Sequence, residues 1–147
     1  ALKRIAEDDT NRLIIYPVHL NPYVQEPVNR ILSPVSNIML IEPLTYEDFI
    51  WLMNRSKIII TDSGGVQEEA PSLGKPVLVM RDTTERPEAV DAGTVLLVGA
   101  DEDLIVSEAL NLLNNHDKFE RMSKLHNPYG DGLASARIID FINKLKL

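Results

Sequence analysis

The chain has 147 residues, enough for one domain with a sizeable core, and its 44% hydrophobic and 25% charged residues are ordinary for a globular protein. Its net charge of −7 argues against a broad nucleic-acid surface, which needs a basic face, but not against a small anionic ligand held by local donors. The absence of cysteine excludes disulfides and thiolate chemistry, and no apolar run is long enough for a membrane helix, so we expect a cytoplasmic protein.

Apolar residues at helical spacing come first along the chain, at Leu2, Ile5 and Ala6, with no capping residue before them. We therefore expect this sequence to be the later part of a longer protein. An apolar run between polar turn residues follows and predicts a buried strand over residues 12–18.

Helix-start signals stand between the next apolar runs. Asn21 and Pro22 fit the N-cap and first position of a helix that reaches about residue 32. Thr45 and Asp48 form a capping-box pattern ahead of a second helix. Further strands are predicted at residues 38–41, 57–61, 77–80 and 94–98, and further helices at residues 88–92, 103–114, 118–125 and 134–145.

Strands and helices alternate throughout, and the strands are continuous apolar runs rather than alternating patterns. This is typical of a parallel sheet covered by helices on both faces. We predict a single α/β domain, a Rossmann-like doubly wound parallel sheet. Ligands of such sheets bind beyond the carboxyl ends of the strands, where His19, residues 62–65 and residues 81–86 lie.

The segment TDSGGVQEEAPSLGKPVL, residues 61–78, puts a double glycine between a strand and a short helix that Pro71 limits. Gly64 and Gly65 lack Cβ atoms, so the backbone can turn tightly and a ligand can come close to it. Free amides at the helix N-terminus favour a phosphate, and Ser63 adds a hydroxyl donor. The segment is neither a P-loop nor a dinucleotide fingerprint, and a tight strand-to-helix turn explains the pattern equally well.

Charged residues around this segment allow more than one interpretation. Glu68 and Glu69 point to different helix faces, so one of them can accept the hydroxyls of a ribose while the other is expected to be a solvated acid. Local ion pairing is expected for Arg81 and is an alternative for Arg86. Outside this segment, His19 stands at a strand end, where a histidine is commonly held by a backbone partner. Phe49 stands early in a helix, where an aromatic residue commonly packs in the core. The stripe of Ile138, Ile139 and Ile142 in the last helix is interpreted as packing, and no metal site is predicted.

The thirty residues TDSGGVQEEAPSLGKPVLVMRDTTERPEAV, 61–90, resemble the signature segment of the non-hydrolysing UDP-N-acetylglucosamine 2-epimerases. LIIYPVHLNP, residues 13–22, and YEDFIWLM, residues 46–53, resemble the same family in the same order, so the resemblance covers nearly the whole chain. It implies the C-terminal half of a GT-B-type fold, in which two Rossmann-like domains enclose the active site. Residues 1–147 would form the UDP-binding domain, and the N-terminal partner domain would be absent from this chain.

The resemblance also implies roles for particular residues. Ser63, Gly64 and Gly65 would bind the diphosphate, Glu69 the ribose hydroxyls, Phe49 would border the uracil, and Arg86 would reach the diphosphate or the sugar. His19 matches a family histidine linked to a second UDP-N-acetylglucosamine, which binds as an allosteric activator.

The family's catalytic carboxylates and its His-Arg-Arg-Glu motif are not in this sequence, so we expect the isolated chain to be inactive. The implied reaction interconverts UDP-N-acetylglucosamine and UDP-N-acetylmannosamine without a cofactor, by elimination of UDP and its re-addition with inversion at C2. Polysaccharide biosynthesis and a homodimeric full-length protein are expected. A hydrolysing 2-epimerase, a GT-B glycosyltransferase donor domain and a non-catalytic nucleotide-sugar sensor stay open as alternatives.

Overall fold

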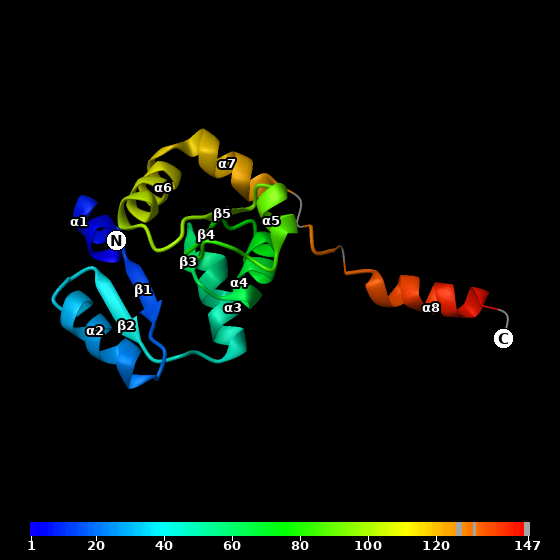
Figure 1. The fold of residues 1–147 in the computed structure, drawn as a ribbon, viewed down its shortest axis with the longest axis horizontal. Helices are drawn as coiled ribbons and strands as arrows, with labels where there is room; N and C mark the ends of the chain where they lie inside the picture. Colours follow the sequence, from blue (N-terminus) through cyan, green and yellow to red (C-terminus); the bar gives the residue numbers. More distant parts are fainter. Residues whose placement is uncertain (126–127, 131, 146–147) are drawn as a thin grey trace.

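The computed structural model describes residues 1–125, 128–130 and 132–145, which form an α/β body with one helix projecting from it (Figure 1). In chain order the elements are α1 (Leu2–Asp8), β1 (Ile14–Pro17), α2 (Pro22–Leu32), β2 (Ile38–Ile41), α3 (Tyr46–Arg55), β3 (Ile59–Thr61), α4 (Gly64–Glu69), the 3-10 helix η1 (Ala70–Leu73), β4 (Val77–Val79), α5 (Pro87–Asp91), β5 (Val95–Leu97), α6 (Glu102–Asn114), α7 (His116–Lys124) and α8 (Ala134–Lys144). The predicted alternation of strands and helices is confirmed.

All paired strands are parallel, as predicted, but they form two ladders rather than one continuous sheet. One ladder joins β1 to β2, and the other has the order β3-β4-β5. Ile59, Val77 and Val95 stand in register across the second ladder. Ile14 of β1 packs against two core clusters, one of which contains Leu78 of β4 and the other Ile38 of β2, so the two ladders share one core.

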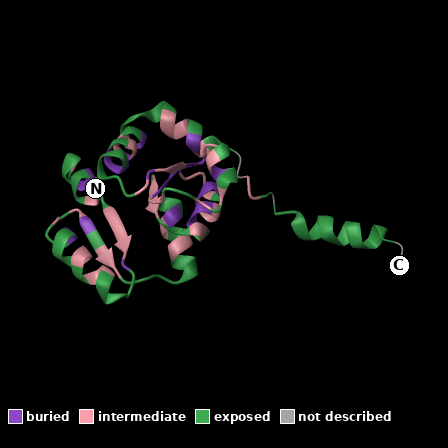
Figure 2. Cartoon of the chain, in the orientation of Figure 1, coloured by how far each residue is buried: buried purple, intermediate pink, exposed green. Residues whose placement is uncertain are grey.

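Helices cover both faces of the larger ladder, as expected for a doubly wound fold. The centre of β4 is wholly buried (Figure 2). Because side chains alternate along a strand, Leu78 faces a cluster that includes Leu112 of α6, whereas Val77 and Val79 face the opposite cluster, which includes Met53 of α3 and Ala70 of η1. The larger ladder is therefore packed from two sides.

Local capping signals fix where two of the early helices begin. The Asn21 side chain accepts a hydrogen bond from the Tyr23 amide, and Pro22 occupies the first turn of α2. The Thr45 hydroxyl oxygen accepts from the amide of Asp48 at 3.3 Å, which confirms the predicted start of α3. Both starts lie beyond the carboxyl end of a strand.

The last helix, α8, lies away from the body (Figure 1), and none of its described residues is buried (Figure 2). Its apolar stripe was expected to pack, but Ile138, Ile139 and Ile142 are 58%, 57% and 53% exposed, so that expectation is wrong within this chain. No helix in the described part of the chain combines the length and the apolar character that crossing a membrane requires.

Candidate functional site

The candidate site lies at the carboxyl edge of the strands, where the loops after β1, β3 and β4 emerge. The first loop carries His19, the second consists of residues 62–63 and leads into Gly64 and Gly65 of α4, and the third carries residues 80–86. Burial, with a smaller contribution from the charge of Asp62, raises the pKa of Tyr16 on β1.

The loop after β3 leads directly into a helix. Ser63 is the N-cap of α4 with extended backbone angles (φ −79°, ψ 133°), and its amide donates to the Thr61 hydroxyl oxygen at 3.0 Å. The Ser63 side chain makes no capping bond and is exposed. Its hydroxyl and the first amides of α4 therefore face the solvent at the same end of the helix.

Gly64 and Gly65 follow in a conformation that does not require glycine. Neither has a positive φ. Apart from adjacent residues and the helix backbone, a Cβ on Gly64 would have no described atom within 4 Å, and a Cβ on Gly65 would meet only the Ser63 hydroxyl oxygen, at 4.0 Å. The expected tight turn is therefore not the reason for the glycines. Close approach of a ligand to the backbone explains the glycines. Without such a role, a glycine in a helix lowers stability by about 0.5–1 kcal/mol relative to alanine.

Gln67, one turn into α4, connects this loop to the loop after β4. Its side chain is completely buried. The amide nitrogen donates to the Ser63 carbonyl oxygen at 3.2 Å, and the amide oxygen accepts from the Thr84 hydroxyl at 2.7 Å. The Thr84 oxygen in turn accepts from the Arg86 amide at 3.0 Å. Sequence reasoning missed both residues; the only signal was a glutamine four residues after an N-cap.

The side chain of Arg86 is held by the next residue of α4. Its Nε donates to Glu68, and that hydrogen bond raises the pKa of Arg86. One of the two adjacent acids was expected to be a solvated acid. Glu68 is the ion-pair partner of Arg86, with both side chains partly exposed. The expected local pairing of Arg81 is confirmed, since its guanidinium lies 3.2 Å from the Glu85 carboxylate.

Glu69 ends α4 and is partly buried. Among the residues that the structure describes, it has no hydrogen-bond or ion-pair partner. The chain then tightens into η1, whose first turn contains Pro71, so the predicted limit of the helix is confirmed. Of the two adjacent acids, Glu68 is occupied by Arg86 and Glu69 is available to a ligand.

The two remaining predicted site residues flank this region. His19 is exposed, and its Nδ1 accepts from the Asn21 amide at 3.1 Å, so the neutral ring presents its N–H at Nε2. This is the backbone partner that sequence reasoning considered. Phe49 is partly buried and packs, with α3, against the cluster that contains Val66 of α4. Its ring therefore belongs to the same part of the core as the buried face of α4.

Comparison with known proteins identifies the family. The profile of the UDP-N-acetylglucosamine 2-epimerase family matches residues 1–143. The chain belongs to this family. It is 58% identical over all 147 residues to a UDP-N-acetylglucosamine 2-epimerase of Salmonella typhimurium, of which it spans 39%. The chain thus spans about two fifths of the length of that relative.

Solved structures of the family have the same fold as this chain. A UDP-N-acetylglucosamine 2-epimerase structure from Listeria monocytogenes matches 97% of the chain at 47% identity, with a TM-score of 0.91, over 38% of its own length. The Neisseria meningitidis enzyme, solved with UDP-N-acetylglucosamine bound, matches 97% of the chain at 49% identity, with a TM-score of 0.89, over 39% of its own length. The predicted Rossmann-like fold of GT-B type is confirmed.

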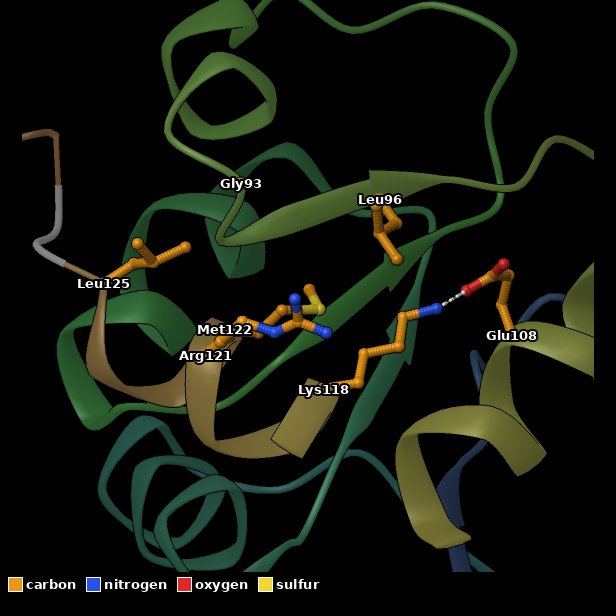
Figure 3. A pocket seen from close by; sticks show the side chains of 7 residues that line it. All are labelled: Gly93, Leu96, Glu108, Lys118, Arg121, Met122 and Leu125. Atoms are coloured by element: carbon orange, nitrogen blue, oxygen red, sulfur yellow. Dashed lines mark hydrogen bonds and ion pairs between the residues drawn. The ribbon is translucent and has the colours of Figure 1, made fainter. Parts of the chain in front are cut away.

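A separate shallow hollow in this epimerase-family chain lies between β5, α6 and α7 (Figure 3). It is lined by Gly93, Leu96, Glu108, Lys118, Arg121, Met122 and Leu125. Gly93 precedes β5, so the hollow reaches the amino end of that strand and contains none of the predicted site residues. Its Lys118 is already paired with Glu108 (Figure 3). Within the described part of the chain, no cluster of His, Asp and Glu side chains is arranged to hold a metal ion.

Proposed function

We propose that the chain is the UDP-binding C-terminal domain of an enzyme that interconverts UDP-N-acetylglucosamine and UDP-N-acetylmannosamine. The observation that carries the proposal is the open space over Gly64 and Gly65, two helical glycines that neither a turn nor a packing contact demands. A diphosphate lying on the amides at the start of α4 would use that space. The Neisseria meningitidis relative binds UDP-N-acetylglucosamine, which is the ligand class that this arrangement suits.

In this proposal the nucleotide lies along α4. The Ser63 hydroxyl and the amides of Gly64 and Gly65 donate to the diphosphate, and Glu69 accepts the two ribose hydroxyls one turn further on. Glu69 has no hydrogen-bond or ion-pair partner among the described residues. This supports the role, because an acid already engaged in an ion pair would have to release its partner first. Phe49 borders the uracil from α3, against which α4 packs.

Arg86 supplies a positive charge beside α4. Its pairing with Glu68 holds the guanidinium beside α4. Both side chains are partly exposed, so the pair contributes little to stability and can be rearranged by a ligand that carries two negative charges. His19 follows the end of β1, and a second nucleotide sugar would bind there as an activator.

The proposed reaction removes the C2 proton and expels UDP from C1, which gives 2-acetamidoglucal. UDP then returns to C1 while a proton adds to the opposite face of C2, so the configuration at C2 is inverted. This domain would hold the leaving UDP in place for its return, and the acid and base groups would come from the N-terminal domain. The isolated chain is therefore proposed to bind UDP without converting the sugar.

Product analysis on the full-length protein tests the proposal. Incubation with UDP-N-acetylglucosamine, followed by proton NMR, should yield UDP-N-acetylmannosamine. Free N-acetylmannosamine with UDP would identify a hydrolysing enzyme instead, and transfer of the sugar to an acceptor would identify a glycosyltransferase. No conversion at all would favour a sensor. The cytoplasmic location and the homodimer stay predictions.

A further inference from the structure

Gln67 is unusual because a completely buried carboxamide stands where an aliphatic side chain of similar volume could fill the same space. Buried polar side chains keep their hydrogen bonds, and this one uses both ends of its amide group. One end reaches the loop after β3, at the Ser63 carbonyl, and the other reaches the loop after β4, at Thr84. Two loops from neighbouring strands are thus joined through one side chain.

The connection continues to the backbone of Arg86. The Thr84 hydroxyl gives its proton to Gln67 and accepts the amide proton of Arg86 at 3.0 Å. Three hydrogen bonds in series therefore run from the N-cap of α4 to the residue that carries the neighbouring cation. The contact between Arg86 and Glu68 fixes the Arg86 side chain separately, so the backbone and the side chain of this residue are each tied to α4.

We infer that Gln67 and Thr84 are positioning residues that set Ser63 and Arg86 at a fixed separation, so that both address the same diphosphate. Neither Gln67 nor Thr84 needs to touch the ligand. The inference rests on the proposed UDP site and goes beyond it, because it assigns the geometry of that site to a buried pair outside the family-derived set of ligand contacts.

The alternative is that the pair only stabilises the fold, and threonine variants separate the two. Thr84→Val keeps the shape and removes the hydroxyl, Thr84→Ser keeps the hydroxyl, and Thr83→Val makes the same chemical change at the exposed neighbouring residue. Each variant of the full-length protein is titrated calorimetrically with UDP and with uridine, which lacks the diphosphate. Hydrogen exchange of the peptide containing Arg86 reports directly on the bond from its amide.

The expected result is a loss of UDP affinity of about threefold to tenfold in Thr84→Val, the range that one or two net hydrogen bonds represent. Uridine affinity stays at the wild-type value, and the Arg86 amide exchanges faster. Thr84→Ser restores UDP affinity, and Thr83→Val behaves as wild type. If Thr84→Val unfolds, Thr84→Ser and a Gln67→Met variant decide. Wild-type UDP affinity in Thr84→Ser, together with a loss of UDP affinity but not of uridine affinity in Gln67→Met, supports the inference.

Equal losses for UDP and uridine in Thr84→Val, or UDP affinity within twofold of wild type, would overturn the inference and leave the UDP site itself intact. Failure of the wild-type protein to bind UDP more tightly than uridine would instead overturn the proposed function. The two failures are therefore read from different titrations.

Discussion

Replacing Gly64 by alanine should stabilise the protein and weaken UDP binding at the same time. The added methyl group meets no described side chain in the folded domain, and the backbone at this position is ordinary for alanine. Alanine in a helix is favoured over glycine by about 0.5–1 kcal/mol, and a first-turn position gains the lower part of that range. The melting temperature should therefore not fall.

The same methyl group obstructs the ligand. Cβ atoms of a helix point toward its N-terminus, so a methyl group on the first residue of α4 enters the space above the free amides. Losing one charge-assisted hydrogen bond to a phosphate costs about 1.5–3 kcal/mol. With about 2 kcal/mol as the net loss, UDP affinity should fall about thirtyfold.

Gly74→Ala is the matched control. Gly74 has a φ of 66°, its Cβ would lie 3.1 Å from the Ser123 carbonyl oxygen, and it precedes β4 at the opposite edge of the sheet. Alanine there should lower stability by about 1–2 kcal/mol and leave UDP affinity unchanged. Calorimetric titration and thermal melting of both full-length variants should show lower UDP affinity without lower stability in Gly64→Ala, and lower stability without lower UDP affinity in Gly74→Ala. Wild-type UDP affinity in Gly64→Ala, or a lower melting temperature, would refute the reasoning.

Glu69→Ala should lower UDP affinity by about thirtyfold and remove most of the discrimination between UDP and 2′-deoxy-UDP. Each hydrogen bond from a ribose hydroxyl to the carboxylate is worth about 1.5–3 kcal/mol before water replaces part of it. Equal discrimination in the variant and the wild type would exclude the ribose role. Glu68→Ala should change UDP affinity by no more than about fivefold, and upward, since it releases Arg86 from an exposed ion pair; a large loss would mean that Glu68 itself binds the nucleotide. The isolated 147-residue chain should melt cooperatively and form no UDP-N-acetylmannosamine. Removal of α8, which has no buried residue, should leave the melting temperature of the chain unchanged. A broad melt with dye binding throughout would contradict an independently folding domain.

Patterns within short stretches of sequence predicted the order of the elements and most of their limits. The backbone groups affected by Asn21, Thr45 and Pro71 lie within a few residues of them. The effects of these residues on α2, α3 and η1 can therefore be predicted from sequence alone. The predicted limits of α5, α6, α7 and α8 differ from the structure by two residues at most, as expected for helix ends, which fray.

Contacts between distant residues could not be predicted in the same way. Glu68 meets Arg86 across 18 positions and Gln67 meets Thr84 across 17, and both pairs depend on how the loops after β3 and β4 come together. The division into two ladders likewise depends on the spacing of β1 and β3, which no local pattern encodes. The apolar stripe of α8 shows the converse: a pattern typical of packing indicates that a partner surface is favoured, not that it lies in the same chain.

UDP is proposed to bind at the carboxyl edge with its diphosphate on the first turn of α4. A crystal structure of the full-length protein with UDP would test this placement. Diphosphate oxygens should lie about 3 Å from the amide nitrogens of Gly64 and Gly65, with both ribose hydroxyls at the Glu69 carboxylate. UDP bound in the hollow between α6 and α7, or at the edge but without contact to these amides, would contradict this placement.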